Sequence, residues 1–151
     1  QFAPGDYYLS VKHRNHLGVM SGTALSLGAS PTDFDLRDAS TPTYGTDAQK
    51  TLSPGVMGLW AGDANGDGRL IFQGAGNDPS VSFLKVLTDP GNNTFARNFI
   101  SFGYEGADVN MDGQIIFQGG GTDTGPIFLN VLSFPGNAAF SRNFTVEEQL
   151  P

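Results

Sequence analysis

The chain has 151 residues, a net charge of −7 at pH 7 and no cysteine, which suits one domain or two small ones and excludes disulfides and thiolate metal sites. No basic cluster of the kind that binds a nucleic-acid backbone is present, and no run of about 18 apolar residues that could span a membrane occurs. Twelve phenylalanines are expected to supply much of a hydrophobic core, and 21 glycines indicate a loop-rich fold.

Residues 1–56 are predicted to form a β-rich head. Short apolar runs separated by Pro and Gly turns indicate about four strands, at 5–15, 16–22, 24–28 and 32–37. An Ig-like sandwich needs about seven strands. We therefore expect a partial sandwich whose open edge accepts a strand from another subunit.

Residues 57–151 contain a duplication. Residues 63–99 align without a gap to residues 108–144, with 21 identical pairs in 37 positions. The repeats cover about residues 60–104 and 105–151, and both have the same order of segments. A polar loop leads into a short extended run, and a glycine-rich turn then leads into a helix predicted at 79–89 or 124–134. The predicted fold class is α+β.

The polar loops begin like a calcium loop of the EF-hand type. Asp63, Asn65 and Asp67 occupy alternate positions and Gly68 follows, but position 12, where an EF-hand has its closing Glu, is Gly74. The second copy repeats this departure. Both copies instead have an Asp at position 16, which predicts a loop lengthened by four residues and closed by that Asp.

Calcium prefers six to eight oxygen ligands from carboxylates, amides, backbone carbonyls and water. The sequence therefore predicts two Ca²⁺ ions, the only cofactors expected. The predicted ligands of the first are Asp63, Asn65, Asp67, the carbonyl of Arg69, and Asp78; those of the second are Asp108, Asn110, Asp112, the carbonyl of Gln114, and Asp123.

Two structural interpretations of the same residues stay open at this point. Alternating Asp and Asn followed by Gly also occur in overlapping Asx-turns, which need no metal. Asp78 precedes Pro79, and Asp123 holds the same place in the second repeat, so both could be helix N-caps. A cap and a metal ligand can be the same residue.

The paired loops, each leading into a helix, resemble dockerins, which are duplicated calcium-binding modules that bind cohesin partners in extracellular bacterial assemblies. Longer motifs, among them "YYLSVKHRNHLGVMS", "LWAGDANGDG" and "DVNMDGQIIFQG", resemble the C-terminal region of large secreted bacterial surface proteins of the adhesin or hemagglutinin kind. This second resemblance implies an extracellular, cell-surface location and no particular activity.

Other candidate residues are fewer. His13 and His16 are expected to form a polar strand end and turn and not a transition-metal site. Trp60 and Tyr104, which each precede a polar loop, are predicted to be core residues and not sugar-stacking platforms. One arginine recurs in both repeats, as Arg97 and Arg142, which predicts a structural task such as bonding loop carbonyls. Two glycosylation sequons are also present, at Asn92 and Asn143.

No hydrolase, metalloprotease or phosphate-binding motif is present, so an enzyme is not expected. The function predicted from the sequence is a calcium-binding structural module of an extracellular bacterial fibre or adhesin. Its partner would be a second copy, added strand by strand into a filament, or another surface protein. The alternatives are a dockerin-like docking module, and a carbohydrate-binding accessory module of a secreted glycan-degrading enzyme.

Overall fold

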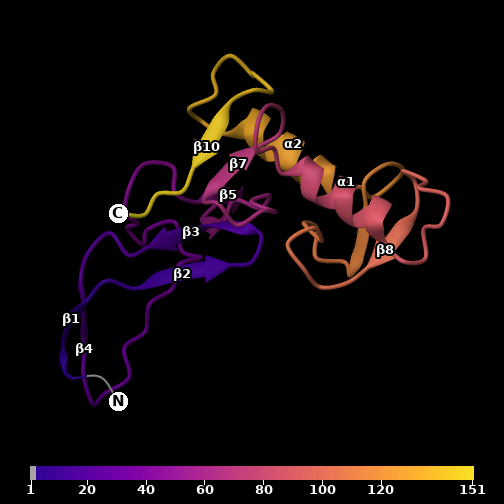
Figure 1. Cartoon of the computed structure of the whole chain (residues 1–151). Coiled ribbons are helices and arrows are strands. Elements are labelled where there is room, and N and C mark those ends of the chain that lie inside the picture. The colour runs from indigo at the N-terminus through magenta and orange to yellow at the C-terminus, as the bar shows by residue number, and fades with distance from the viewer. Residues whose placement is uncertain (1–2) are drawn as a thin grey trace. The chain divides into compact units, whose positions relative to one another are not determined.

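The computed structural model describes residues 3–151 as a mixture of ten short strands and two helices (Figure 1). In this part of the chain the strands pair two by two, giving five two-stranded sheets. The expectation of an α+β fold is confirmed. The partial sandwich predicted for the head does not appear, because none of its strand pairs joins another into a larger sheet.

The chain divides into two compact units. The first consists of the described residues up to Lys12, residues 18–60 and residues 148–151; the second consists of residues 13–17 and 61–147. The main boundary between the units lies between Trp60 and Ala61. The two short exchanges were not predicted: the tip of the first hairpin belongs to the second unit, and the last four residues belong to the first.

The first unit is built from short hairpins, and its buried apolar residues include Val19, Ala48 and Trp60. Trp60 is 3% exposed and its indole N–H donates to the carbonyl of Asp47 at 2.8 Å, which confirms its prediction as a core residue. Residues 32–37, predicted as a strand, form none. The strand pairs of the head are β1 (Gly5–Tyr7) with β4 (Leu25–Leu27), β2 (Ser10–His13) with β3 (His16–Met20), and β5 (Lys50–Ser53) with β6 (Val56–Gly58).

The C-terminal residues 148–151 are held to the rest of the first unit by the side chains of Glu148 and Gln149. Glu148 forms an ion pair with Lys12 at 2.9 Å and accepts the amide of Gly18 at 2.7 Å, while Gln149 accepts the amide of Thr46 at 3.2 Å. These contacts join residues more than 100 positions apart. They explain why residues 148–151 leave the second repeat, to which the sequence assigned them.

The second unit contains the two repeats, whose elements follow the predicted order. The first repeat has β7 (Arg69–Ile71), α1 (Pro79–Thr88) and β8 (Ile100–Phe102); the second has β9 (Gln114–Ile116), α2 (Thr124–Ser133) and β10 (Thr145–Glu147). Both helices end within one residue of the predicted position, and Pro90 and Pro135 follow their ends. The extended runs after the polar loops are confirmed as strands.

The repeats are interlocked. Strand β7 pairs antiparallel with β10, and β8 pairs antiparallel with β9, so each sheet contains one strand from each repeat. The helices follow the same rule, with α1 packed on β9 and α2 on β7. Two equivalent ring contacts, Phe72 with Phe128 and Phe83 with Phe117, have the same centroid distance of 4.8 Å and the same interplanar angle of 55°.

The core of the second unit is aliphatic. Val86, Ile115, Leu70 and Val131 are fully buried, whereas no phenylalanine of the described residues is among the buried ones. Phenylalanine is therefore absent from the fully buried core of the described residues, and Phe99 and Phe117 contribute to it only as half-buried rings packed against its surface. Very short strands and ten-residue helices enclose a thin interior that small branched side chains fill, and the larger rings lie at its edges or in solvent.

Candidate metal centre

Loop 1 (residues 63–78) folds its first six residues into a tight turn around the carboxylate of Asp63. The two oxygens of that carboxylate accept the backbone amides of Asp67 and Gly68, each at 3.0 Å. Asn65 and Asp67 make the Asx-type bonds expected of a turn, at 2.9 Å each. Gly68 has a φ of 78°, so the bend lies where glycine alone is unstrained.

The closing Asp78 has a role that neither sequence interpretation named. It occupies the N-cap position of α1, but its side chain forms no cap hydrogen bond with the helix, so the capping role considered for this carboxylate is wrong. Its carboxylate instead reaches back to the loop. One oxygen accepts the amides of Ala64 at 2.8 Å and Asn65 at 3.4 Å, and the other accepts the amide of Ile71 at 2.8 Å. Asp78 thus ties both ends of the turn to the helix.

Loop 2 (residues 108–123) repeats this brace. Asp123 accepts the amides of Val109 at 2.7 Å, Asn110 at 3.3 Å and Ile116 at 2.8 Å, and it too forms no helix cap. Both closing carboxylates are fully buried. The late Asp seen in the sequence is therefore an organising residue in both loops.

Burial makes these carboxylic acids weaker, because it raises their pKa values. It raises the pKa of Asp78 to about 7, although the three amide hydrogen bonds act in the opposite direction. The pKa values of Asp123 and Asp63 are raised for the same first reason. A nearby cation would favour the charged forms, so these loops are places where positive charge is stabilising.

The loops differ at their first Asp. In loop 2 one oxygen of Asp108 accepts the amide of Gly113 at 3.3 Å and lies 3.5 Å from a guanidinium nitrogen of Arg14. The other oxygen is buried and accepts no hydrogen bond. Its counterpart on Asp63 faces the turn, where it bonds the amide of Asp67. Loop 2 therefore contains a buried, unsatisfied carboxylate oxygen at the position where a cation ligand is expected.

Among residues 3–151 no group of three or more His, Cys, Asp or Glu side chains is arranged to hold a metal ion. A calcium ion in either loop would therefore rely on two turn carboxylates together with the amide oxygen of Asn65 or Asn110, backbone carbonyls and water, which is within calcium's usual chemistry. Arg69 and Gln114, whose carbonyls are predicted ligands, begin β7 and β9 directly after the turns. The ligand sets stay predictions, and in them the closing ligands Asp78 and Asp123 have both carboxylate oxygens bonded to backbone amides.

The two histidines form the polar hairpin end that the sequence indicates. Their Nδ1 atoms lie 2.9 Å apart, and the side-chain oxygen of Asn15 lies 3.0 Å from that of His13 and 2.8 Å from that of His16. Burial, with the charges of His13 and Arg14, lowers the pKa of His16 to about 4. A neutral His16 in this network belongs to the structure of the turn.

The structure corrects two other predictions. Tyr104 is 74% exposed and is not a core residue; its ring instead lies under the guanidinium of Arg14, at 5.4 Å. Arg97 and Arg142 are exposed, and no hydrogen bond or ion pair of either is found in the described part of the chain, so they do not bond the loop carbonyls. An exposed residue can recur in both repeats simply because the repeats were duplicated.

A pair of asparagines performs the task predicted for those arginines. Asn92 and Asn137 are buried, and each donates to a carbonyl at the end of its helix and to a second one four residues ahead, at 2.8–2.9 Å. Their recurrence in the repeats was visible in the sequence. A glycan on Asn92 would have to displace both bonds, whereas the other sequon residue, Asn143, is exposed.

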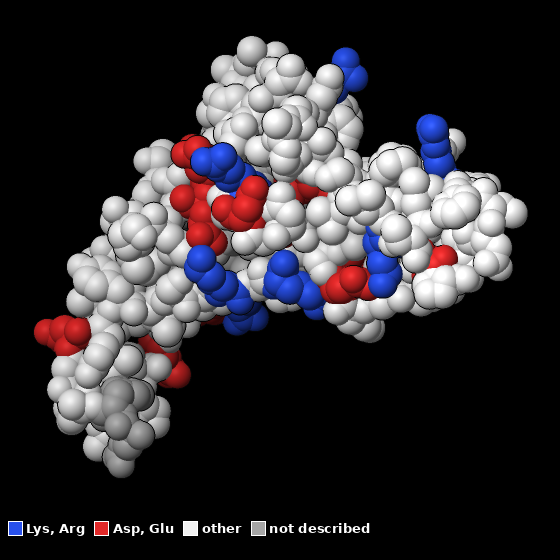
Figure 2. Space-filling view, viewed as in Figure 1, with Lys and Arg blue, Asp and Glu red and all other residues white. Residues whose placement is uncertain are grey.

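Charged side chains of both signs are spread over the face drawn in Figure 2. Its Lys and Arg side chains stand singly or beside Asp and Glu, and no broad basic patch is seen on the described residues of that face.

No helix formed by residues 3–151 has the length and apolar character needed to cross a membrane. Comparisons with protein-family models, curated proteins and solved structures found no match.

Proposed function

We propose that residues 61–147 form a calcium-binding structural module in which each loop holds one ion. The observation that carries this proposal is the buried oxygen of Asp108 that accepts no hydrogen bond, within a turn that the chain builds twice. An unsatisfied buried carboxylate oxygen costs free energy that a bound cation offsets. Asp63, Asn65 and Asp67, and their counterparts in loop 2, would supply side-chain ligands, and Asp78 and Asp123 would hold the loops in shape.

Calcium would act here as a brace and not as a catalyst. Binding that requires the folded loop stabilises the fold by linkage. Because β7 and β9 directly follow the turns that open the two loops and each pairs with a strand of the other repeat, ordering one loop supports both repeats. Millimolar calcium outside cells suits loops that offer only two carboxylates each.

The setting proposed for this module is an extracellular bacterial fibre or adhesin. The pair β1–β4 supports strand addition, since it forms a sheet of only two strands in the described part of the chain, which a further strand would extend. Tyr8, Leu9 and Val11, near this pair, are at least 38% exposed. A further strand from a second copy, or from another surface protein, would cover such an edge and build an open-ended assembly.

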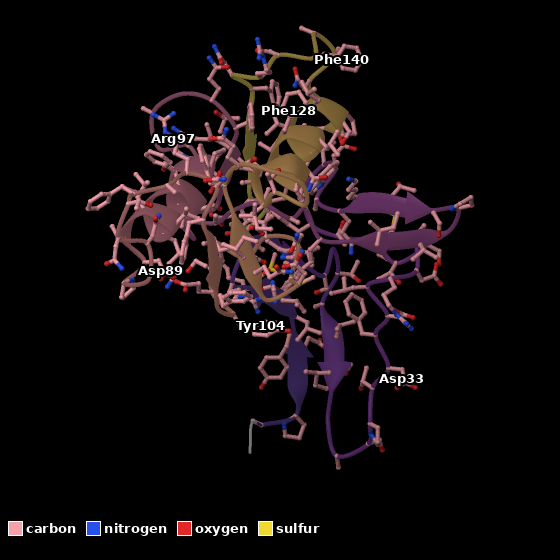
Figure 3. All side chains as sticks on the ribbon, turned by 90° about the vertical axis from the view of Figure 1, so that its right-hand side faces the viewer. Asp33, Asp89, Arg97, Tyr104, Phe128 and Phe140 are labelled. Carbon is pink, nitrogen blue, oxygen red and sulfur yellow. The ribbon has the colours of Figure 1, made fainter. Side chains whose placement is uncertain are left out.

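A dockerin-like docking module is the second candidate, because apolar side chains are exposed at equivalent places in both repeats. Leu84 and Leu129 on the helices are 58% and 61% exposed, and Phe95 and Phe140 are both 71% exposed. Figure 3 shows the ring of Phe140 pointing away from the ribbon. Size-exclusion chromatography with light scattering separates the candidates: calcium-dependent polymers favour the fibre, and a monomer that binds one non-self partner favours docking.

The test of calcium binding is thermal melting with and without a chelator. Two ions at about 100 times their dissociation constants would add roughly 5 kcal/mol, which corresponds to a melting temperature about 10 °C higher. The double variant Asp63→Asn/Asp108→Asn is the matched control and should melt at one temperature in both conditions. An unchanged melting temperature of the native chain on chelation would remove the calcium proposal.

A further inference from the structure

The two loops have nearly the same backbone but different electrostatic surroundings. In loop 1 the carboxylate of Asp63 is satisfied by two amides of its own turn, and no Lys, Arg or His lies within ion-pair distance of it among the described residues. In loop 2 the equivalent Asp108 shares one oxygen between its own turn and Arg14. Only loop 2 therefore contains a positive charge of the protein at its first predicted ligand.

Arg14 is held in this position by several contacts. Its Nε donates to the carbonyl of Glu105 at 3.3 Å, and its guanidinium lies over the ring of Tyr104. The neighbouring Asn15 is fully buried and donates to the backbone carbonyl of Asp108 at 2.5 Å. The hairpin tip and the start of loop 2 thus form one connected site. Before loop 1 the same tip makes a backbone contact, in which the amide of Gly62 donates to the carbonyl of Asn15 at 2.8 Å.

We propose that Arg14 is a tethered cation that competes with calcium for loop 2. This inference rests on the calcium-binding function proposed above. Loop 1 binds calcium first. Loop 2 binds it at a higher concentration, and its occupation moves the guanidinium of Arg14 away from Asp108. Without calcium, Arg14 supplies loop 2 with part of the positive charge that the ion would bring.

Coulomb's law supports this order of binding. A guanidinium that touches one oxygen of Asp108 lies within a few ångströms of any ion on the other oxygen, and at that distance two positive charges repel strongly even when partly screened by solvent. Arg14 is 32% exposed, so we expect a weakening of calcium binding by at least about tenfold and not a complete block. Displacing the guanidinium also breaks its contacts with Glu105 and Tyr104.

Isothermal titration calorimetry of full-length single-loop variants with CaCl2 tests the proposal. Asp63→Asn leaves loop 2, and Asp108→Asn leaves loop 1. Arg14→Met should tighten binding to loop 2 by about tenfold or more and leave binding to loop 1 unchanged. Arg142→Met removes the same charge from an exposed site and should change neither affinity. Arg14→Lys, which keeps the charge, should have a smaller effect than Arg14→Met.

The outcomes separate the two proposals. If both loops bind calcium but Arg14→Met leaves the affinity of loop 2 within twofold, or tightens both loops equally, the competition is overturned and calcium binding stands. If neither loop binds calcium in any variant, both proposals are overturned.

Nuclear magnetic resonance of the native chain gives a second test that does not depend on a substitution. During a calcium titration the amide of Gly68 should shift first. The amide of Gly113 and the Nε of Arg14 should shift together at a calcium concentration about tenfold higher or more. Simultaneous shifts of both glycines, or an Nε of Arg14 that does not follow Gly113, would overturn the competition.

Discussion

Loop 1 and loop 2 have the same ligand pattern and the same buried brace, but two differences between them bear on the turn and on its first Asp. The fourth position is Gly66 in loop 1 and Met111 in loop 2, and both adopt positive φ, at 73° and 62°. The first Asp bonds only to its own turn in loop 1 and also to Arg14 in loop 2. Duplication therefore kept the closing carboxylates identical and let the open side of each loop diverge.

This comparison separates two kinds of residue. Asp78 and Asp123 hold the chain in the loop conformation, because each satisfies three backbone amides from inside the protein. Under the calcium proposal, residues on the outer side would adjust calcium affinity and backbone strain while the path of the backbone stays the same. Substitutions at the brace should affect both loops alike, and substitutions on the outer side should affect them unequally.

The largest effect is expected from removing the brace. In chelator, Asp78→Ala and Asp123→Ala should each lower the free energy of unfolding by about 3 kcal/mol, because buried amides lose their acceptor. Urea denaturation followed by circular dichroism measures the change. A loss above 2 kcal/mol in one variant and below 0.5 kcal/mol in the other would break the equivalence of the two loops.

The raised pKa of Asp78 predicts a pH dependence in chelator. Because its folded pKa of about 7 exceeds the unfolded one, the folded state holds an extra proton that it loses as pH rises through 7. Between pH 6.5 and 8 we expect the free energy of unfolding to fall by about 1 kcal/mol. Asp63 and Asp123 act in the same direction.

His16 acts in the opposite direction, because its folded pKa of about 4 lies below its unfolded value, and over this window it offsets only about 0.4 kcal/mol of the fall; most of its stabilisation is lost below pH 6.5. Saturating calcium should abolish or reverse the fall, because calcium binds the ionised carboxylates. Asp78→Asn should flatten the profile in chelator. Stability that rises from pH 6.5 to 8 in chelator would show that Asp78 is already ionised in the folded state.

The smallest effect is expected at the fourth loop position. Met111 is a non-glycine residue with a φ of 62° and is 47% exposed, so its side chain has little packing to lose. Met111→Gly should stabilise the chain by about 0.5–1 kcal/mol, and Gly66→Met should destabilise it by a similar amount. Thermal melts of the two variants give the comparison, and equal signs would contradict it.

Much of the second unit could be predicted from sequence because its sequence is duplicated. The helices, the short strands after the loops and the late Asp recur with an offset of 45 residues, so each copy checks the other. The crosswise pairing of β7 with β10 and β8 with β9 could not be predicted. Strand pairing between repeats is non-local, and either repeat's own strands fit the hydrophobic pattern equally well.

The site was predicted in part. The turn residues follow from local chemistry, since Asp and Asn bond amides a few positions ahead. The role of Asp78 could not be inferred, because a carboxylate that precedes a helix has the same sequence pattern whether it caps the helix or reaches back to the loop. Arg14 was missed as well, since it meets Asp108 across 94 positions and nothing near it in the sequence indicates a partner.

The central claim, that both loops bind calcium, is tested most directly by counting the ions bound per chain. Equilibrium dialysis against millimolar calcium should give two ions for the native chain and one for each of the variants Asp63→Asn and Asp108→Asn. A native chain that binds no calcium, or whose count neither substitution changes, would contradict the account.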